Sequence, residues 1–399
     1  MTTTTATDVY YDMYDRDIYA SPYETFRRLR NEAPLYYNEK YDFYAVSRHD
    51  DLSRVLSDRD TYISGNGMVY SAMSDEVAMP PGLFISEDPP MHTMHRAIVS
   101  RLFTPRAVGG LEPQIRKLCD ELVDGLVGRD RFDFVRDFAV QLPVQVIGML
   151  VGVPKADQAD LLEVFRRTMH EGTADPEQAQ MSGILEAAKW FEGYLDWREK
   201  NPSDDVMTQL MRFEFEDETG TTRTLRRDEI ITYLVLITSA GSDTTATAIS
   251  WAGSILSDHP DQRRELVDDP SLVPNAVEEV LRYEPPSYHF CRWTTKDSEF
   301  HGVTVPKDSI LVVLPPAANR DERKWDDPER FDIHRQPGQV FTFSFGPHFC
   351  LGANLARLET RIALETILAR IPEWTCDYDN AELTLGIATR GYDVLPVSV

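Results

Sequence analysis

Cysteine, basic charge and long apolar segments are all scarce in this sequence. Only four of its 399 residues are cysteines, and no two form a Cys-x-x-Cys pair, so a zinc finger or a disulfide framework is not expected. Lysine and arginine total 41 against 66 aspartates and glutamates, which gives a formal net charge of −25. Because like charges repel, this balance opposes binding to nucleic acid or to anionic lipid.

No segment has the pattern of a targeting sequence or a membrane span. The N-terminus is polar, with neither a basic region nor an apolar core, so we expect no signal peptide. The longest apolar run, around 230–240, ends in Gly-Ser-Asp and is shorter than the roughly 20 residues that a span requires. These features predict a cytoplasmic protein in a reducing compartment, and we expect it to be a monomer.

The organisation of the chain favours one domain. Length alone would allow two or three, but no linker, internal repeat or low-complexity segment divides the sequence, so we predict a single domain over residues 1–399. A composition of 42% apolar and 27% charged residues is typical of globular proteins. A chain of this length can bury a large core and still enclose a cofactor.

Helical periodicity dominates, and the predicted fold is mainly α with small β-sheets. Residues 230–256 are nearly all apolar, as expected of a helix through the middle of a protein. Further helices are predicted over 22–31, 114–127, 142–150, 184–194, 274–283 and 351–371. Alternating or β-branched runs predict a hairpin over 35–46, short strands over 292–314 and a second hairpin over 383–399.

The most informative segment surrounds Cys350. Gly346 and Gly352 bracket this cysteine, and glycine lets a backbone turn tightly and approach a flat partner. The apolar pattern after Cys350 is helical, which places it at a helix N-terminus, where amide N–H groups and the helix dipole lower the pKa of a thiol. A thiolate so placed is either a nucleophile or a metal ligand. Cys119 and Cys376 have no such surroundings, and we interpret them as structural.

The run Phe345-Gly346-x-His348-x-Cys350-x-Gly352 resembles the haem-binding signature of the cytochrome P450 superfamily, of the soluble bacterial type. The resemblance implies the family fold, with haem b between the long central helix and the cysteine loop, and Cys350 as the iron ligand. A cysteine thiolate ligand favours O–O cleavage. The resemblance therefore implies a monooxygenase that inserts one atom of O2 into an organic substrate, by hydroxylation or epoxidation.

A small and polar block, Ala240-Gly241-Ser-Asp243-Thr244-Thr, interrupts the long apolar segment. Gly241 and the threonine hydroxyls can loosen helical hydrogen bonding and open a groove, although close packing between helices would explain the block equally well. The block resembles the family's oxygen-activation motif. By that resemblance Gly241 lies against the cofactor, Thr244 donates a hydrogen bond to dioxygen, and Asp243 relays protons from solvent.

Two further groups of residues resemble family features. Glu279 and Arg282, one helical turn apart, would form a structural cluster with Arg335. The haem propionates need cationic or hydrogen-bonding partners, and the matching residues are His92, Arg96, Arg292 and His348. Cys291 and Trp293 flank Arg292 where the family usually has smaller side chains, so the local shape of the pocket is left open.

The resemblance also assigns a substrate pocket, which is largely apolar. Its predicted residues are Val69, Leu83, Phe84, Ile237, Ala240, Tyr288, His289 and Ile387. A single apolar residue is more often core than ligand contact, but together they predict a hydrophobic small molecule such as a terpenoid, fatty acid, steroid or polyketide. Tyr288 and His289 would supply polar groups.

No flavin or iron–sulfur domain is fused to the chain, so we expect electrons from a ferredoxin and a ferredoxin reductase. A basic face near the cysteine loop would suit an acidic ferredoxin, although balanced surface charge is an equal interpretation. The residues of this predicted face are Arg96, Arg101, Arg106, Arg116, Lys117, Arg357 and Arg361.

Three alternative functions stay open from the sequence alone. Cys350 could be a nucleophile, but His348 is only two residues away and poorly placed as its base. The protein could be a haem-thiolate carrier or sensor, although a carrier needs no proton relay such as Asp243 and Thr244. It could also be a peroxygenase that uses peroxide directly, but an intact Thr244 favours dioxygen.

Overall fold

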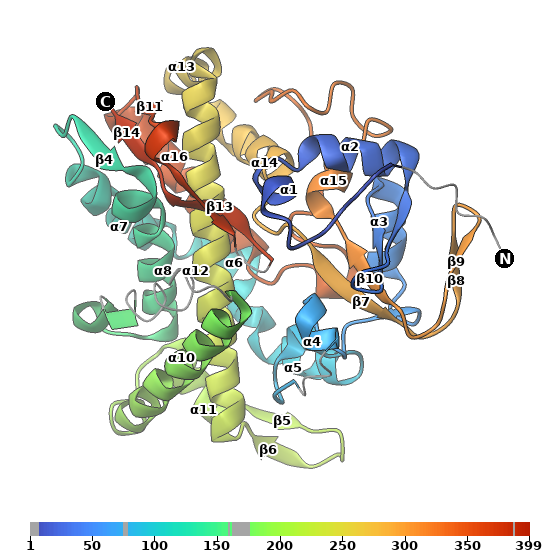
Figure 1. Cartoon of the computed structure of the whole chain (residues 1–399). Coiled ribbons are helices and arrows are strands. Elements are labelled where there is room, and N and C mark those ends of the chain that lie inside the picture. The colour runs from blue at the N-terminus through green and yellow to red at the C-terminus, as the bar shows by residue number, and fades with distance from the viewer. Residues whose placement is uncertain (1–7, 75–78, 159, 162–175, 386–387) are drawn as a thin grey trace.

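The computed structural model describes residues 8–74, 79–158, 160–161, 176–385 and 388–399. Helix α12 (Arg227–Asp258) runs through the middle of the molecule, and the other elements are arranged around it (Figure 1). Most of its side chains are buried and apolar, because neighbouring elements cover several of its faces. The predicted central helix over 230–256 is confirmed and extends slightly at both ends.

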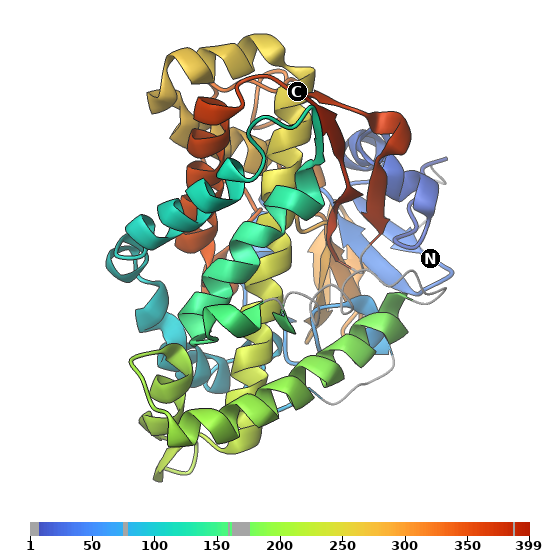
Figure 2. The same ribbon diagram turned by 90° about the vertical axis from the view of Figure 1, so that its left-hand side faces the viewer.

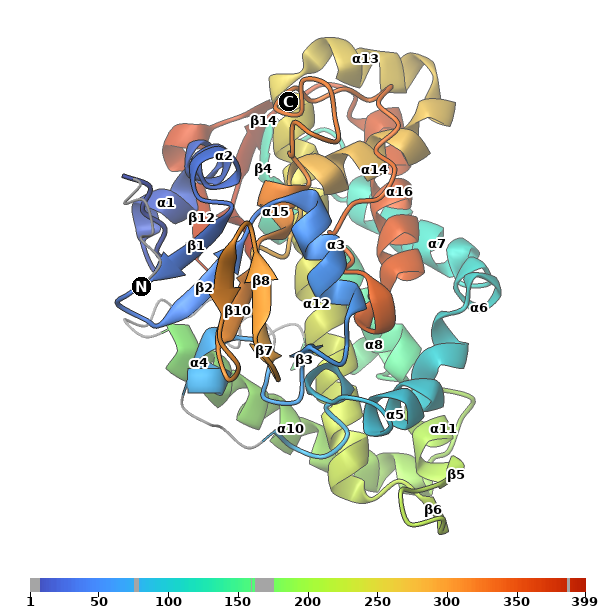
Figure 3. The same ribbon diagram turned by 90° about the vertical axis from the view of Figure 1, so that its right-hand side faces the viewer.

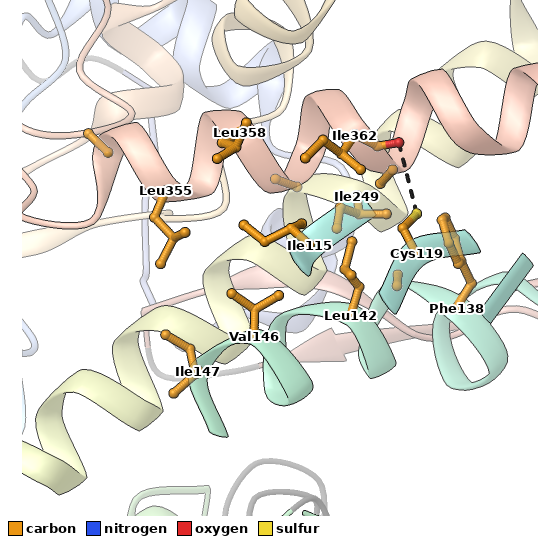
Figure 4. Close-up of a cluster of buried hydrophobic side chains, with 14 of the residues drawn as sticks. Ile115, Cys119, Phe138, Leu142, Val146, Ile147, Ile249, Leu355, Leu358 and Ile362 are labelled. Atoms are coloured by element: carbon orange, nitrogen blue, oxygen red, sulfur yellow. Dashed lines mark hydrogen bonds between the residues drawn. The ribbon is translucent and has the colours of Figure 1, made fainter. Parts of the chain in front are cut away.

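Three helices cover one side of α12 (Figure 2), and they are α7 (Glu112–Asp124), α8 (Gln141–Val151) and α16 (Ala353–Arg370). Their apolar faces form the main core, in which Ile115 and Ile249 lie together (Figure 4). Cys119 is buried in the same core, where its thiol donates to the carbonyl of Ile362 at 3.9 Å. This position agrees with the structural role predicted for it.

A five-stranded sheet lies on the other side of α12, in the order β1-β2-β10-β7-β3 (Figures 1 and 3). β1 (Leu35–Asn38) and β2 (Phe43–Val46) form the predicted antiparallel hairpin. β10 (Ile310–Val313) pairs in parallel with β2 and antiparallel with β7 (Phe290–Thr294), and β3 (Tyr62–Ile63) pairs with β7 at the edge. The short strands predicted over 292–314 are therefore confirmed.

Further helices and strands surround α12, the three helices packed around it and the five-stranded sheet. The other helices used below or drawn in Figure 1 are α1 (Arg16–Ala20), α2 (Tyr23–Glu32), α3 (His49–Ser57), α4 (Tyr70–Ser74), α5 (Met91–Ser100), α6 (Pro105–Gly109), α10 (Pro176–Lys200), α11 (Val206–Arg212), α13 (Pro260–Asp268), α14 (Val273–Tyr283) and α15 (Pro315–Ala318). The other strands are β4 (Arg131–Asp133), β5 (Glu214–Glu216), β6 (Thr222–Thr224), β8 (Ser298–Phe300), β9 (Val303–Val305), β11 (Thr375–Cys376), β12 (Glu382–Leu385), β13 (Arg390–Val394) and β14 (Pro396–Ser398).

The tail differs from the single hairpin predicted over 383–399. β12 and β13 do pair antiparallel, but β14 pairs with β4 and β11 instead. The chain changes partner at Leu395, whose carbonyl accepts a hydrogen bond from the N–H of Phe134 at 2.8 Å. Contacts with a distant segment, which local sequence does not encode, set this pairing.

Among the described residues, one stretch, Phe134–Val151, is long and apolar enough to cross a membrane by length and composition. However, 61% of it is buried against the rest of the protein, and it contains α8, which packs on α12. This burial is typical of a core helix.

Candidate active site

Cys350 lies in a tight loop directly before α16. Its backbone N–H donates to the carbonyl of Phe343 at 2.8 Å. Gly346 has a φ of +70°, and a Cβ there would collide with the carbonyl oxygen of Leu56. Glycine is therefore required at this turn, as predicted. The helix begins after Gly352, which is its N-cap, so Cys350 lies just before the helix start.

The surroundings of Cys350 raise the pKa of its thiol, contrary to the lowered pKa predicted from sequence. Burial is the largest cause, because protein atoms crowd the thiol even though the residue as a whole stays exposed. The amide N–H groups of Gly352 and Ala353 and the charges of Arg96 and Arg357 act in the opposite direction without offsetting it. A bound metal ion, which deprotonates a coordinating thiol, would supply the missing positive charge.

Four cationic or ionisable side chains gather beside this loop without carboxylate partners among the described residues. Arg292 on β7 is only 2% exposed, and its guanidinium donates only to the carbonyl of the preceding residue, at 2.8 Å. Arg96 on α5 donates to the carbonyl of Phe349 at 2.6 Å. The ring of His92 lies 4.1 Å from that of His348, and its Nε2 is buried without a partner.

The pKa values of Arg292 and His348 are lowered, because burial disfavours their charged forms and no carboxylate among the described residues offsets it. Burial lowers the pKa of Arg292 to about 10. Burial also lowers the pKa of His348 to about 2, and the nearby Arg292, His92 and Arg96 lower it further. A buried charge without a partner costs several kcal/mol, so the cluster suits a ligand that brings carboxylates. The two propionates of haem fit this donor set.

The small and polar block of α12 is the accessible part of an otherwise buried helix. Tyr233 to Thr238 and Thr245 to Leu256 are buried, whereas residues 239–241, 243 and 244 are accessible. The helix continues through the block, as the predicted helix over 230–256 requires; Thr244 Oγ1 donates to the carbonyl of Ala240 at 2.7 Å, an ordinary contact along the helix. An accessible surface at the middle of the molecule is what a ligand requires.

Gly241 contributes to helix packing. A Cβ at this position would lie 2.7 Å from Cδ1 of Ile147 on α8, so glycine allows α12 and α8 to approach closely. Its predicted contact with the cofactor stays a prediction.

The predicted structural cluster is present. Arg282 donates to both carboxylate oxygens of Glu279 at 2.7 and 2.8 Å, and both side chains are fully buried. Arg335 reaches the same carboxylate at 3.2 Å through its Nε. Both arginines also donate to backbone carbonyls of residues 326–330, so the cluster joins α14 to the segment that precedes the cysteine loop.

Comparison with known proteins decides the family. The cytochrome P450 family model matches residues 155–376. A protein named putative cytochrome P450 123, from Mycobacterium tuberculosis, is 35% identical over 397 residues, which cover 97% of this chain and 96% of the relative. The chain belongs to the cytochrome P450 family.

Other relatives agree with this assignment. The vitamin D(3) 25-hydroxylase of Pseudonocardia autotrophica is 33% identical and aligns over 100% of this chain and 98% of its own. The structure of a P450 EryK mutant in complex with erythromycin B superposes with a TM-score of 0.85 at 31% identity, covering 95% of this chain and 96% of that one. The chain is thus a P450 monooxygenase with the family fold, and the alternatives of a cysteine nucleophile or a carrier without turnover are excluded.

The predicted residues of the substrate pocket differ in burial. Phe84 and Ile237 are buried, Val69 and Leu83 are partly buried, and Ala240 is exposed. Ile387 lies outside the described residues. The pocket itself stays a prediction.

Tyr288 and His289 have different surroundings. The ring of Tyr288 packs 4.5 Å from that of Tyr19 and 5.5 Å from that of Phe26, which turns it toward the N-terminal segment and argues against its predicted place in the pocket. His289 is buried, and its Nδ1 has no hydrogen-bond partner in the described part of the chain; burial lowers its pKa to about 4, so it is neutral at pH 7.

The strand geometry of β7 settles the question raised by Trp293. Alternate residues of a strand face opposite sides. Cys291 and Trp293 pack on one face of the sheet, in an apolar cluster with residues of the N-terminal segment such as Phe26. Phe290 belongs to a separate apolar cluster on the other face, and the guanidinium of Arg292 lies over its ring. The large Trp293 side chain therefore leaves the surroundings of Arg292 free.

Most of the predicted basic face is neutralised by ion pairs. Arg116 and Arg361 both pair with Glu112 and Glu365. Arg357 pairs with Glu278, and Lys117 pairs with Glu121. Arg101 and Arg106 are exposed and form no ion pair with a described residue. The basic face is therefore smaller than predicted.

Sequence analysis missed three buried ionisable residues near the site. Glu359 on α16 is fully buried, and neither carboxylate oxygen has a hydrogen-bond partner in the described part of the chain. Glu87 and His95 form a buried pair before and within α5. The sequence signal for such residues is a polar side chain at an inward-facing position of an apolar helix. Only the fold shows whether that side chain has a partner.

Proposed function

We propose that this P450 binds haem b through Cys350 and oxidises an uncharged, mainly hydrophobic small molecule with electrons from a ferredoxin. The observation that carries the proposal is a group of two arginines and two histidines beside Cys350 that have no carboxylate partner among the described residues. Arg292, Arg96, His92 and His348 would bind the propionates, and Cys350 would bind the iron. When bound, the haem supplies oxygen activation, which a thiolate ligand favours.

Thr244 and Asp243 would control proton delivery. The Thr244 hydroxyl now donates to the Ala240 carbonyl at 2.7 Å and could turn toward the oxygen substrate without moving the helix. Asp243 is partly buried on the adjacent helical position, where a carboxylate can pass protons from solvent to the hydroxyl. This arrangement favours dioxygen over peroxide as the oxidant.

The proposed substrate class rests on the apolar pocket and on the relatives. Phe84 and Ile237 provide apolar surface, and the neutral His289 offers a hydrogen bond without charge. Among the relatives, one is named for vitamin D(3) hydroxylation, and structural neighbours were solved with erythromycin B and with testosterone. Vitamin D(3) and testosterone are largely apolar molecules and erythromycin B is a polyketide, which suits a steroid or polyketide better than a fatty acid.

We further propose that ferredoxin docks over Arg101, Arg106 and the exposed Phe349, which is 41% exposed beside Cys350. α6, which carries Arg106, packs on α16, and Asn354 at the start of α16 donates to the carbonyl of Phe103 at 3.3 Å. Arg106 therefore lies near the start of α16, whereas the guanidinium of Arg101 lies over the ring of Phe213, farther along the same surface. Their positive charge suits an acidic partner.

The visible spectrum of the reduced, carbon-monoxide-bound protein tests the haem-thiolate assignment. We expect a strongly red-shifted Soret band in the wild type and in Cys376→Ala, a buried cysteine on β11. Cys350→Ala should lose this band and all turnover. A wild-type spectrum without the shift, or an unchanged spectrum in Cys350→Ala, would refute the assignment.

Electron balance tests the role of Thr244. In Thr244→Ala we expect the haem spectrum to persist while peroxide replaces most of the product formed per NAD(P)H consumed. Thr244→Ser, which keeps the hydroxyl, should restore product formation. Full coupling in the alanine variant would remove Thr244 from the proton path.

A further inference from the structure

We propose that Glu87, His95 and Tyr233 are positioning residues, which fix segment 82–87 against the face of α12 that carries Thr244 and fix α5 relative to α12. We call these three residues the junction. The proposal rests on the proposed function, because it takes Thr244 and the propionate-binding residues of α5 as the site that the junction positions.

The Glu87 carboxylate accepts hydrogen bonds from both Gly82, at the start of segment 82–87, and His95 on α5. Nδ1 of His95 donates to Oε2 of Glu87 at 2.7 Å and lies 2.9 Å from Oε1. Oε1 also accepts the backbone N–H of Gly82 at 3.2 Å. The side chains of His95 and Glu87 are 2% and 15% exposed, so water competes little for these contacts. Hydrogen bonds to a carboxylate shielded in this way are among the stronger ones in proteins.

Tyr233 joins the same structure to α12. Its hydroxyl donates to the backbone carbonyl of His95 at 3.0 Å, and its side chain is fully buried. The ring of Phe84 lies 5.9 Å from the Tyr233 ring. Gly82 has a φ of +86°, and a Cβ there would lie 3.4 Å from Cε2 of Tyr233, so the segment packs directly on this tyrosine.

Helix geometry connects the junction to the reaction site. Tyr233, Ile237, Ala240 and Thr244 follow one another at intervals of four, three and four residues, which places them on one face of α12. At 1.5 Å per residue, Tyr233 lies about 16 Å along the axis from Thr244. The contact of Phe84 with Tyr233 therefore continues the apolar surface of Ile237 and Ala240. A looser junction would move part of the predicted substrate pocket.

The junction also affects the propionate side. His95 lies on α5 between His92 and Arg96, and its own carbonyl is the acceptor for Tyr233. Nε2 of His95 is buried and has no hydrogen-bond partner among the described residues, so the hydrogen bonds that orient the imidazole come from Glu87. Losing either contact would free α5 to shift relative to α12, and with it the residues that bind the propionates.

Two small substitutions and a matched control test the proposal in the holoenzyme. Glu87→Gln keeps the size but removes the charge, and Tyr233→Phe removes one hydroxyl. Tyr23→Phe is the control, because the Tyr23 hydroxyl also donates to a carboxylate and a carbonyl, those of Glu284 and Tyr283, outside the junction. The readouts are hydrogen–deuterium exchange of residues 82–87 and the association rate of carbon monoxide after flash photolysis.

We expect exchange in segment 82–87 to become about tenfold faster in Glu87→Gln, the loss typical of one hydrogen bond to a charged group, and a few-fold faster in Tyr233→Phe, which loses a hydrogen bond between neutral groups. Carbon monoxide association should also become several-fold faster, whereas Tyr23→Phe should change neither readout. Unchanged exchange, an equal effect of Tyr23→Phe, or faster exchange with unchanged carbon monoxide association would each overturn the proposal. Failure of the proposed function would instead appear in the wild type, as a reduced carbon-monoxide spectrum without the thiolate band.

Discussion

Two clusters of buried arginine in this P450 differ in how their charges are matched. In the structural cluster, Arg282 is fully buried, and its donors reach both oxygens of Glu279 and three backbone carbonyls. Beside the cysteine loop, Arg292 is nearly as buried, but among the described residues it meets only the carbonyl of its neighbour. Burial lowers the pKa of Arg292 to about 10, as expected of a charge without a counter-charge.

The difference teaches which arginines serve the fold and which serve a ligand. A matched cluster satisfies itself, so its loss is felt as lost stability. In an unmatched cluster, the buried charges raise the free energy of the folded protein, and binding of an anion offsets this penalty. Residue type alone does not distinguish the two kinds of arginine. The family resemblance assigns Arg282 and Arg292 different roles, and the presence or absence of carboxylate partners gives the physical reason.

The largest expected effect comes from breaking the matched cluster. Arg282→Met should lower the free energy of unfolding by about 3–5 kcal/mol, because it leaves the buried Glu279 carboxylate with Arg335 and the backbone N–H of Asp332 on one oxygen and removes the donor to the other. Urea denaturation of the holoenzyme, followed by circular dichroism, measures this loss. A change below about 1 kcal/mol, the size typical of a surface pair, would show that the cluster is not the structural unit described.

A smaller and different effect is expected from the unmatched cluster. Arg292→Leu should leave the unfolding free energy nearly unchanged and accelerate haem loss about 10- to 100-fold, the effect of one lost charge-assisted hydrogen bond. Transfer of haem to apomyoglobin measures this rate. Arg263→Leu is the control, since Arg263 is buried but donates to the carbonyls of Leu256 and Trp374. Equal haem loss in both variants would contradict the distinction.

Much of the fold could be predicted from the sequence because its helices are long and strongly periodic. The central helix around Ile237 and the hairpin of β1 and β2 depend on local apolar patterns, which the sequence carries. The tail could not be predicted, because β14 pairs with β4, more than 250 residues earlier in the chain. That choice depends on packing between distant segments.

In the candidate site, too, features encoded in one short segment could be predicted, whereas features that depend on distant segments could not. Cys350 and Gly346 were found because several specific residues must coincide within one loop. The thiol pKa was predicted with the wrong sign, because sequence shows the nearby helix start but not the depth of burial. Arg357 was counted as free basic charge, but Glu278, from another helix, lies 2.6 Å away. Sequence gives the charges, and only the fold gives their partners.

Glu359 extends the comparison to an acid whose carboxylate oxygens have no hydrogen-bond partner among the described residues. Burial raises its pKa well above the usual value, which favours the neutral carboxyl in the fold. A raised folded-state pKa contributes stability that is fully present below the unfolded-state pKa and is lost as the pH rises through the folded-state pKa. Each tenfold difference between the acid dissociation constants of the folded and unfolded states corresponds to about 1.4 kcal/mol of stability.

The glutamine variant makes this loss measurable. Because Glu359→Gln is neutral at every pH, the variant should gain stability relative to the wild type as the pH rises above about 4.5, the usual pKa of a glutamate. Urea unfolding of both proteins across this range gives the difference. A stability difference independent of pH would mean that Glu359 is charged in the fold and has a partner.

The smallest expected effect concerns matched and unmatched arginines on the surface. Arg106→Gln removes a charge that has no ion-pair partner among the described residues, whereas the double variant Arg357→Gln/Glu278→Gln removes a neutral pair and leaves the net charge unchanged. If ferredoxin docks through long-range attraction, Arg106→Gln should slow its electron transfer a few-fold at low ionic strength, and the difference should vanish as salt screens the charges. The double variant should change this rate little, because the long-range field of the surface stays nearly the same. Stopped-flow reduction under carbon monoxide measures both rates. Equal slowing by the two variants would mean that docking does not depend on unmatched charge, and the distinction between matched and unmatched arginines would then hold only for buried positions.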